Sequence, residues 1–194
     1  MKILGICLLL VAASSLRGSP QPFLLEPAES RPKEIGGLEF SIVTQSVFLP
    51  DGRDSVVQLR ITNRGTAPLL FPTFDSFSIT LTGPDHKPVP LGGNRDATTI
   101  TPNILLQPGK SFCWPLSVRL KSSAKPGSLE LDFKDPTGSQ SLSTLKPGSY
   151  TLQCELFPTH YDFAGKGGLP APLWSAKGST EPVSITLDAP EPAR

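Results

Sequence analysis

Residues 145–157, LKPGSYTLQCELF, contain a turn followed by a strand pattern. In Lys146-Pro147-Gly148, proline presets φ at the first central position of a turn, and glycine can take positive φ at the next. Apolar and polar residues then alternate. The residues on the apolar face are Tyr150, Leu152, Cys154 and Leu156. This period of two predicts a half-buried β-strand.

A second turn of the same kind occurs earlier, at Leu106-Gln107-Pro108-Gly109. The alternating run behind it has the apolar members Phe112, Trp114, Leu116, Val118 and Leu120. Further alternation occupies residues 38–48, 57–62, 77–82, 129–133 and 183–187, with Pro, Gly and Asn turn signals between the runs. No stretch shows helical periodicity. We therefore predict an all-β protein, an antiparallel β-sandwich of about seven to nine strands.

The composition is compatible with one ordinary domain. Hydrophobic residues make up 38% of the 194 positions, enough for a single core with polar loops. The formal net charge of +1 gives no reason to expect binding to nucleic acid or to an anionic membrane.

The N-terminal residues 1–19 have the features of a signal peptide. Lys2 supplies a positive charge, residues 3–11 form an apolar run too short to span a bilayer, and small residues follow at 12–15. Cleavage after Ala13, after Ser15 or slightly later fits the small-residue rule, and an uncleaved anchor is the alternative. We predict an extracytoplasmic protein, secreted or periplasmic, with no transmembrane segment after signal removal.

The remaining chain divides into three parts. Residues 20–37, rich in proline and charge, are predicted to be a flexible lead-in. Residues 38–188 form the sandwich, and residues 189–194 a proline-rich tail. Within the sandwich, residues 91–96 are predicted to be a loop, and residues 158–180 a long irregular segment.

Several stretches resemble known bacterial domains. Residues 57–65, VQLRITNRG, followed by Pro68-Leu69, are similar to the opening strand of bacterial immunoglobulin-like domains. Residues 77–90, 106–111 and 145–156 resemble the bacterial intracellular proteinase inhibitor family. The resemblance covers residues 38–156 and implies an immunoglobulin-like sandwich. Inhibitory activity is not carried over, because the family's Trp-Arg pair is replaced by Pro88-Val89-Pro90-Leu91 and because the export signal conflicts with an intracellular location.

No motif predicts catalysis, a cofactor or a metal. His86 and His160 have no partner at metal-ligand spacing, and there is no Gly-x-Ser-x-Gly nucleophile motif. Cys113 and Cys154 are the only cysteines beyond the signal. An oxidising compartment favours a disulfide between them. Strand parity favours two free thiols, with Cys154 facing inward and Cys113 outward, unless a bulge near Pro115 changes the register. Both outcomes stay open.

The long segment 158–180 contains the candidate partner-binding residues. Tyr161, Phe163 and Trp174 are large side chains that a purely solvated linker would not hold, although Trp174 is also suited to plug the open end of a sandwich. The function predicted is that of an exported, non-enzymatic binding or structural module. Its partner is a protein or, as the second choice, a carbohydrate. A protease inhibitor and a carbohydrate-binding module are the alternatives.

Overall fold

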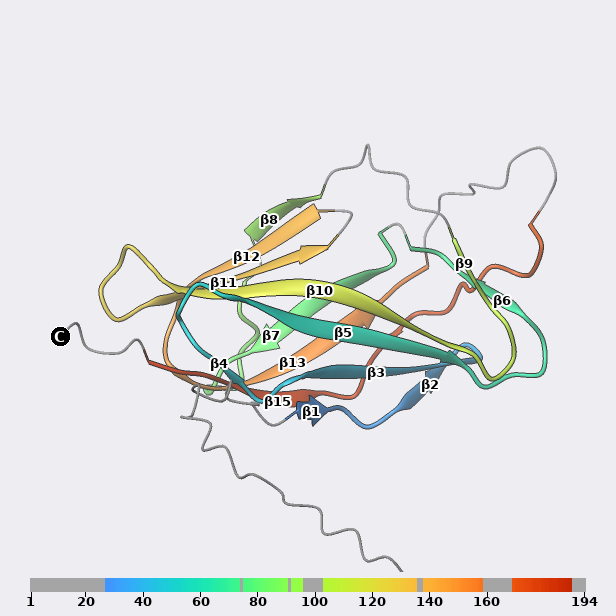
Figure 1. Ribbon diagram of the computed structural model, residues 1–194, viewed down its shortest axis with the longest axis horizontal. Helices are drawn as coiled ribbons and strands as arrows, with labels where there is room; N and C mark the ends of the chain where they lie inside the picture. Colours follow the sequence, from blue (N-terminus) through green and yellow to red (C-terminus); the bar gives the residue numbers. More distant parts are fainter. Residues whose placement is uncertain are drawn as a thin grey trace, which may run out of the picture.

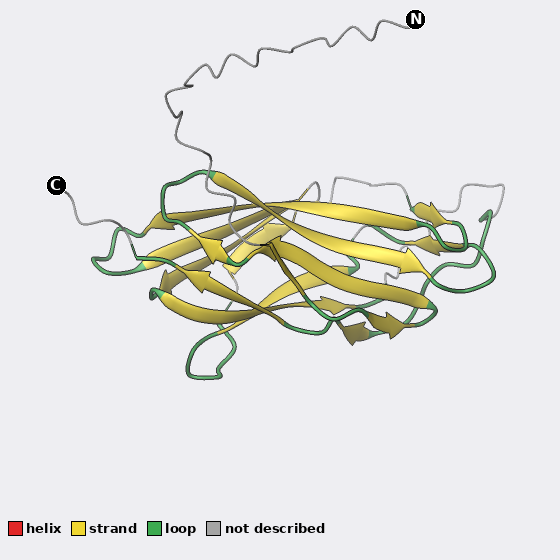
Figure 2. Cartoon of the chain, turned by 60° about the horizontal axis from the view of Figure 1, so that its bottom comes forward, coloured by secondary structure: helices red, strands yellow, loops and turns green. Residues whose placement is uncertain are grey.

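The computed structural model describes residues 27–73, 75–90, 92–95, 103–135, 138–158 and 169–189. Two β-sheets lie face to face as two layers (Figures 1 and 2). Within these ranges the regular structure is entirely strand, so the prediction of an all-β, sandwich-like protein is confirmed. None of the described residues belongs to a helix with the length and apolar character needed to cross a membrane.

The larger sheet contains eight strands. Their order is β1 (Pro27–Glu29), β3 (Leu38–Gln45), β5 (Asp54–Asn63), β10 (Ser111–Ser122), β11 (Leu129–Asp135), β12 (Gly138–Leu145) and β8 (Gly92–Arg95), with β2 (Lys33–Ile35) also paired to β3. All its pairings are antiparallel.

The smaller sheet is organised around β13 (Gly148–Leu156), the strand that follows the Lys146-Pro147-Gly148 turn. β7 (Phe77–Thr82) pairs with one edge of β13, and β14 (Gly178–Ser179) and β15 (Val183–Leu187) pair with it as well. β4 (Val47–Phe48) runs parallel to β15. The chain therefore changes sheets at Ser46, between β3 and β4. A separate ribbon of β6 (Leu69–Phe71) and β9 (Ile104–Leu106) lies at one end (Figure 1).

The core follows the alternation seen in the sequence. In β13, Tyr150, Leu152, Cys154 and Leu156 are all at most 5% exposed, while Glu155 faces solvent. Trp114, Leu116, Val118 and Leu120 of β10 are buried in the same way from the opposite sheet. The Tyr150 hydroxyl donates to the carbonyl of Lys146 at 2.8 Å and accepts from its N–H at 3.1 Å. These bonds tie the start of β13 to the turn before it.

The number of strands is a correction to the sequence analysis. The described residues form fifteen strands rather than seven to nine, although only eight of them have five or more residues. Residues 92–95, predicted to be a loop, form the edge strand β8, which pairs with β12. β12 itself escaped prediction because a bulge breaks its alternation: Leu142 and Leu145 are both buried, and Thr144 between them has a φ of 62°.

The lead-in is a second correction. Residues 27–37 are not a flexible connection, because β1 and β2 both pair with β3 and form one interrupted edge strand. Ser30 bridges the interruption: its N–H donates to the Ile42 carbonyl, and its hydroxyl accepts from the Ile42 N–H, both at 2.9 Å. Charged residues and proline are typical of flexible segments, but they are also typical of edge strands, where they prevent pairing with another chain. The composition of residues 27–37 therefore could not distinguish the two. The predicted signal, residues 1–19, and residues 20–26 lie outside the described part of the chain.

Candidate partner-binding surfaces

Trp174 is buried at the end of the sandwich that carries β6 and β9. Its side chain is 2% exposed, and its ring lies 5.5 Å from the rings of both Phe40 and Phe71. The indole N–H donates to the Ile35 carbonyl at 2.9 Å. Of the two roles considered for Trp174, it therefore has the structural one, closing the end of the sandwich. Its side chain is too buried to contact a partner. Tyr161 and Phe163, the other candidates, lie outside the described residues.

The backbone around Trp174 is hydrogen-bonded to β6. Residues 172–174 run beside β6: the Leu70 N–H donates to the Pro172 carbonyl at 2.9 Å, and the Trp174 N–H donates to the Leu70 carbonyl at 2.8 Å. Gly36 is required where this segment meets β2, because a Cβ there would approach the Ala176 Cβ to 2.4 Å, and its φ is +60°. Part of the segment predicted to be irregular is therefore fixed to the sandwich.

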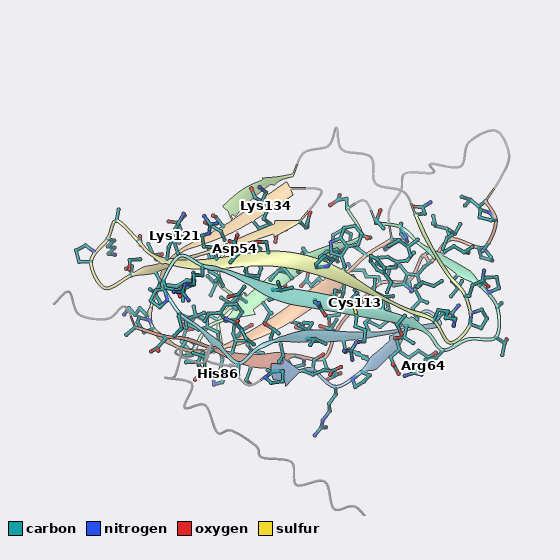
Figure 3. All side chains as sticks on the ribbon, in the orientation of Figure 1. Asp54, Arg64, His86, Cys113, Lys121 and Lys134 are labelled. Atoms are coloured by element: carbon teal, nitrogen blue, oxygen red, sulfur yellow. The ribbon has the colours of Figure 1, made fainter. Side chains whose placement is uncertain are left out.

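The two cysteines of the described residues, Cys113 and Cys154, are free and lie in different environments. Cys113 is exposed on the outer face of the larger sheet, opposite Arg60, and Cys154 is buried in the smaller sheet. Figure 3 labels Cys113 on the larger sheet, where β10 runs beside β5. A disulfide is not formed, because Cys113 points away from the core into which Cys154 points. Burial raises the pKa of Cys154 to about 12.

Of the two histidines, only His86 lies in the described part of the chain. His86 is exposed in the turn after β7, and its N–H donates to the Gly83 carbonyl at 3.0 Å. His160 lies outside the described residues. Within the part of the chain that the structure describes, His, Cys, Asp and Glu form no group of three or more that could hold a metal ion.

A row of paired charges crosses the outer face of the larger sheet. This charged row consists of Asp54, Arg119, Lys121, Glu130 and Asp132. Arg119 Nε donates to Asp54 Oδ1 at 2.9 Å, and Lys121 Nζ lies 3.0 Å from Asp132 Oδ2 and 3.4 Å from Glu130 Oε1. Figure 3 shows Asp54 and Lys121 near each other, with Lys134 from the neighbouring strand. No residue of the row was singled out from the sequence for this surface, because its members come from three strands.

The charges of the row act mainly on one another. Burial raises the pKa of Asp132, but hydrogen bonds from Ser141 and Lys121 and the charges of Lys121 and Arg119 outweigh it, so the net shift is downward. The Arg119 pKa is raised by its hydrogen bond to Asp54, and the Lys121 pKa by its hydrogen bond to Asp132. Exposed ion pairs of this kind contribute little to stability, because water screens their attraction. The row lines a hollow of about 580 Å³. Because its charges are already paired with one another, it offers a ligand few unpaired groups.

A groove of about 580 Å³ lies at the other end of the sandwich, between two turns. Its apolar lining consists of Pro84, Pro88, Val89, Pro90, Leu145, Pro147 and Tyr150. We call it the proline groove. Its four prolines are exposed at the surface, whereas Leu145 and Tyr150 are buried beneath them. Asp85, Lys87 and Lys146 add charges to the lining.

Hydrogen bonds fix both walls of the proline groove. In the wall after β7, the Gly83 N–H donates to the Lys87 carbonyl at 2.9 Å, and the Val89 N–H donates to the Leu81 carbonyl at 2.8 Å. The wall before β13 is held by the Tyr150 hydroxyl. The walls meet where Pro84 Cγ lies 3.6 Å from the position that a Cβ on Gly148 would occupy.

Backbone strain also concentrates in these walls. The described residues include three non-glycine residues with positive φ. Of these, His86, at 61°, is in the turn after β7, and Thr144, at 62°, is in the bulge of β12 and lines the groove. Left-handed geometry is unfavourable for a β-branched residue such as Thr144 and is often found at ligand-binding positions. The hydrogen-bonded walls and the exposed prolines form an open, largely apolar groove.

The sequence was compared with protein-family models and with curated proteins. No protein-family model matches the chain, and no curated protein matches it either. The resemblance to the proteinase inhibitor family therefore stays a prediction.

We expect Trp174→Ala to lower the free energy of unfolding by about 3–5 kcal/mol, because it removes a buried aromatic side chain and leaves the Ile35 carbonyl without its donor. Leu169→Ala is the matched control in the same segment. Leu169 is 37% exposed, so the change should stay within about 0.5 kcal/mol. Denaturant unfolding measures both, and equal effects would contradict the burial assigned to Trp174.

The two thiols should react at very different rates with an alkylating reagent in the native protein at pH 8. Cys113 is accessible, whereas Cys154 is shielded and protonated because burial has raised its pKa to about 12. Mass spectrometry should find one label before unfolding and two after it, and Cys113→Ser should abolish the native label. Two fast labels, or none before reduction, would contradict the assigned faces of the two strands.

The lowered pKa of Asp132 predicts an acid-dependent contribution to stability. Its ionised form stabilises the fold above the usual carboxyl pKa of about 4, and this contribution disappears as the pH falls through the lower folded value. The difference in unfolding free energy between wild type and Asp132→Asn should thus shrink as the pH falls below about 4. NMR titration should show Ser141→Ala moving the Asp132 pKa upward; an unshifted Asp132 pKa in the wild type would contradict the network.

Proposed function

We propose that this chain is an exported, non-enzymatic binding module that takes an apolar peptide segment of a partner protein into the proline groove. The observation that carries the proposal is the groove itself. It combines four exposed proline rings with two hydrogen-bonded walls at one end of the sandwich.

The chemistry of the lining supports a peptide ligand. Proline loses no rotamer freedom when a ligand covers it, so its apolar ring is a contact surface with a small entropic cost. The Tyr150 ring lies under the groove with its hydroxyl already satisfied by Lys146. An aromatic or branched apolar side chain fits this environment, and the lysines and Asp85 of the lining can orient the peptide around it.

A protein partner is favoured over a carbohydrate. Sugar-binding sandwiches generally need exposed aromatic side chains as platforms, and the exposed large apolar residues of the described chain are Leu49, Val56, Leu105 and Leu169. Trp174, one of the three aromatic candidates, is in the core. Protease inhibition is one form of protein binding, and no observation on the described residues favours it over the others.

The proposal includes an immunoglobulin-like sandwich as the scaffold. Two features support this finer assignment. The chain switches sheets at Ser46, so that β4 runs parallel to β15, and the Tyr150 hydroxyl bonds to backbone four residues upstream, as in the tyrosine corner of that fold. Export is supported by the charge and hydropathy pattern of residues 1–19.

Two matched variants test the function. Pro147 and Pro108 are both exposed and occupy the same position of a Leu-x-Pro-Gly turn, but only Pro147 lines the groove. Pro147→Glu places a charge in the apolar lining, and we expect it to reduce partner capture from the native exoproteome about tenfold, equivalent to about 1.4 kcal/mol. Pro108→Glu should leave capture unchanged. Equal capture by wild type and Pro147→Glu, measured by quantitative mass spectrometry, would refute the role of the groove.

A further inference from the structure

We infer that the protein binds one water molecule between its two sheets, held by the side-chain amide of Gln140 and by the main chain of Ile79. The site lies where β7 of the smaller sheet faces β12 of the larger one. It is separate from the proline groove and does not depend on the function proposed for that groove.

Gln140 is a polar residue on the inward face of β12. It has the same parity as the buried Leu142, and it is paired with Phe133, whose side chain is 3% exposed. Its neighbours Ser139 and Ser141 line the hollow on the outer face of the sheet. Gln140 is half-buried as a whole, but its Oε1 atom has less than 1 Å² exposed, and no donor of the described residues reaches it. Buried polar atoms rarely stay unpaired, because they have lost their bonds to solvent.

The Gln140 side chain borders a small cavity between the sheets. The cavity has a volume of about 10 Å³, and Phe77 and Ile79 of β7 line it together with Leu116 and Phe133 of the larger sheet. A cavity of roughly 10–15 Å³ is the smallest that holds one water molecule. Purely apolar cavities stay dry, whereas a polar group on the wall favours hydration. The size and the wall of this cavity therefore suit a single water molecule.

The main chain of Ile79 supplies the other polar groups. Ile79 is paired with Cys154, but the Cys154 N–H donates to the Thr180 hydroxyl at 3.1 Å, and the Cys154 carbonyl accepts from the Thr180 N–H at 2.9 Å. Ile79 and Cys154 thus form a non-hydrogen-bonded pair, in which each residue directs its N–H and carbonyl away from the other. The Leu81 carbonyl, two residues further on, likewise points away from β13 and accepts from the Val89 N–H.

The Ile79 N–H and carbonyl therefore face the free edge of β7. No hydrogen bond between described residues uses them, although Ile79 is only 2% exposed. One water molecule satisfies all three groups: it donates to Gln140 Oε1 and to the Ile79 carbonyl, and it accepts from the Ile79 N–H. Three hydrogen bonds are the usual number for a buried water. The water links the two sheets, which explains why a glutamine occupies an inward position in β12.

NMR cross-relaxation between water and backbone amides tests the site in the ¹⁵N-labelled protein. The Ile79 amide should show a water cross peak with the sign of a long-lived complex, which rapidly exchanging surface water does not give. The Thr80 amide, which belongs to a hydrogen-bonded pair with Gln153 of β13, is the internal reference and should show no such peak. An Ile79 amide without the long-lived peak would overturn the inference.

Two neighbouring variants assign the peak to the site. Gln140→Leu removes the acceptor and fills the cavity with apolar atoms, so the Ile79 peak should disappear. Ser139→Ala is the matched control, because Ser139 also lines the cavity but is exposed, and its hydroxyl could relay magnetisation from solvent. The peak should survive this change. A peak that persists in Gln140→Leu, or that is lost in Ser139→Ala, would overturn the assigned site.

A high-resolution crystal structure of the wild type gives a second measurement that needs no variant to fold. We expect an ordered water molecule within hydrogen-bond distance of the Gln140 side chain and the Ile79 main chain. A dry cavity, or a Gln140 side chain turned out to solvent, would contradict the inference. Neither result bears on partner capture through Pro147, so the two proposals fail separately.

Discussion

Burial of one face of each long strand against the opposite sheet is the constraint on which this structure depends. Phe40 and Ile42 of β3, Trp114 and Leu116 of β10 and Leu152 of β13 all enter the same core. Side chains alternate with a period of two, so a register slip of one residue would expose a whole apolar set and bury its polar neighbours. The same rule separates the cysteines: Cys154 shares the inward parity of Leu152, and Cys113 has the outward parity between Phe112 and Trp114.

Polar contacts organise the chain where the alternation stops. Asn63 has a fully buried side chain whose Nδ2 donates to the carbonyls of Ala67 and Leu106, both at 2.8 Å, and whose Oδ1 accepts from the Gly65 N–H at 2.9 Å. It joins the turn after β5 to the turn before β10. Thr180 acts similarly, because its hydroxyl accepts from the Cys154 N–H at the break between β14 and β15. Each of these groups satisfies backbone atoms that burial would otherwise leave unpaired.

The two ends of the sandwich therefore differ in kind. At one end, Trp174 fills the space between Phe40 and Phe71 and closes the core. At the other, prolines stand at the surface around a groove whose floor includes Leu145 and Tyr150. Closing one end with an aromatic plug stabilises the fold, while the open end presents a rigid apolar surface. Under the proposed function, a ligand in the groove would leave the core undisturbed, because the groove walls are held by their own hydrogen bonds.

The amino-acid sequence alone determined the all-β class, the two Leu-x-Pro-Gly turns and the burial of β10 and β13, because alternation and turn chemistry are local. It favoured opposite parity for Cys113 and Cys154 but left a disulfide open, and the structure decided for two free thiols. Only the tertiary structure decided that 27–35 form an edge strand and that β12 continues through the bulge at Thr144, since both depend on a neighbouring strand for their hydrogen bonds. Trp174 could be placed in the core only once Phe40 and Phe71 were seen around it. The proline groove could not be predicted either, because in the sequence Pro84 and Pro147 are each typical of an ordinary turn. Only the pairing of β7 with β13 brings the two turns together.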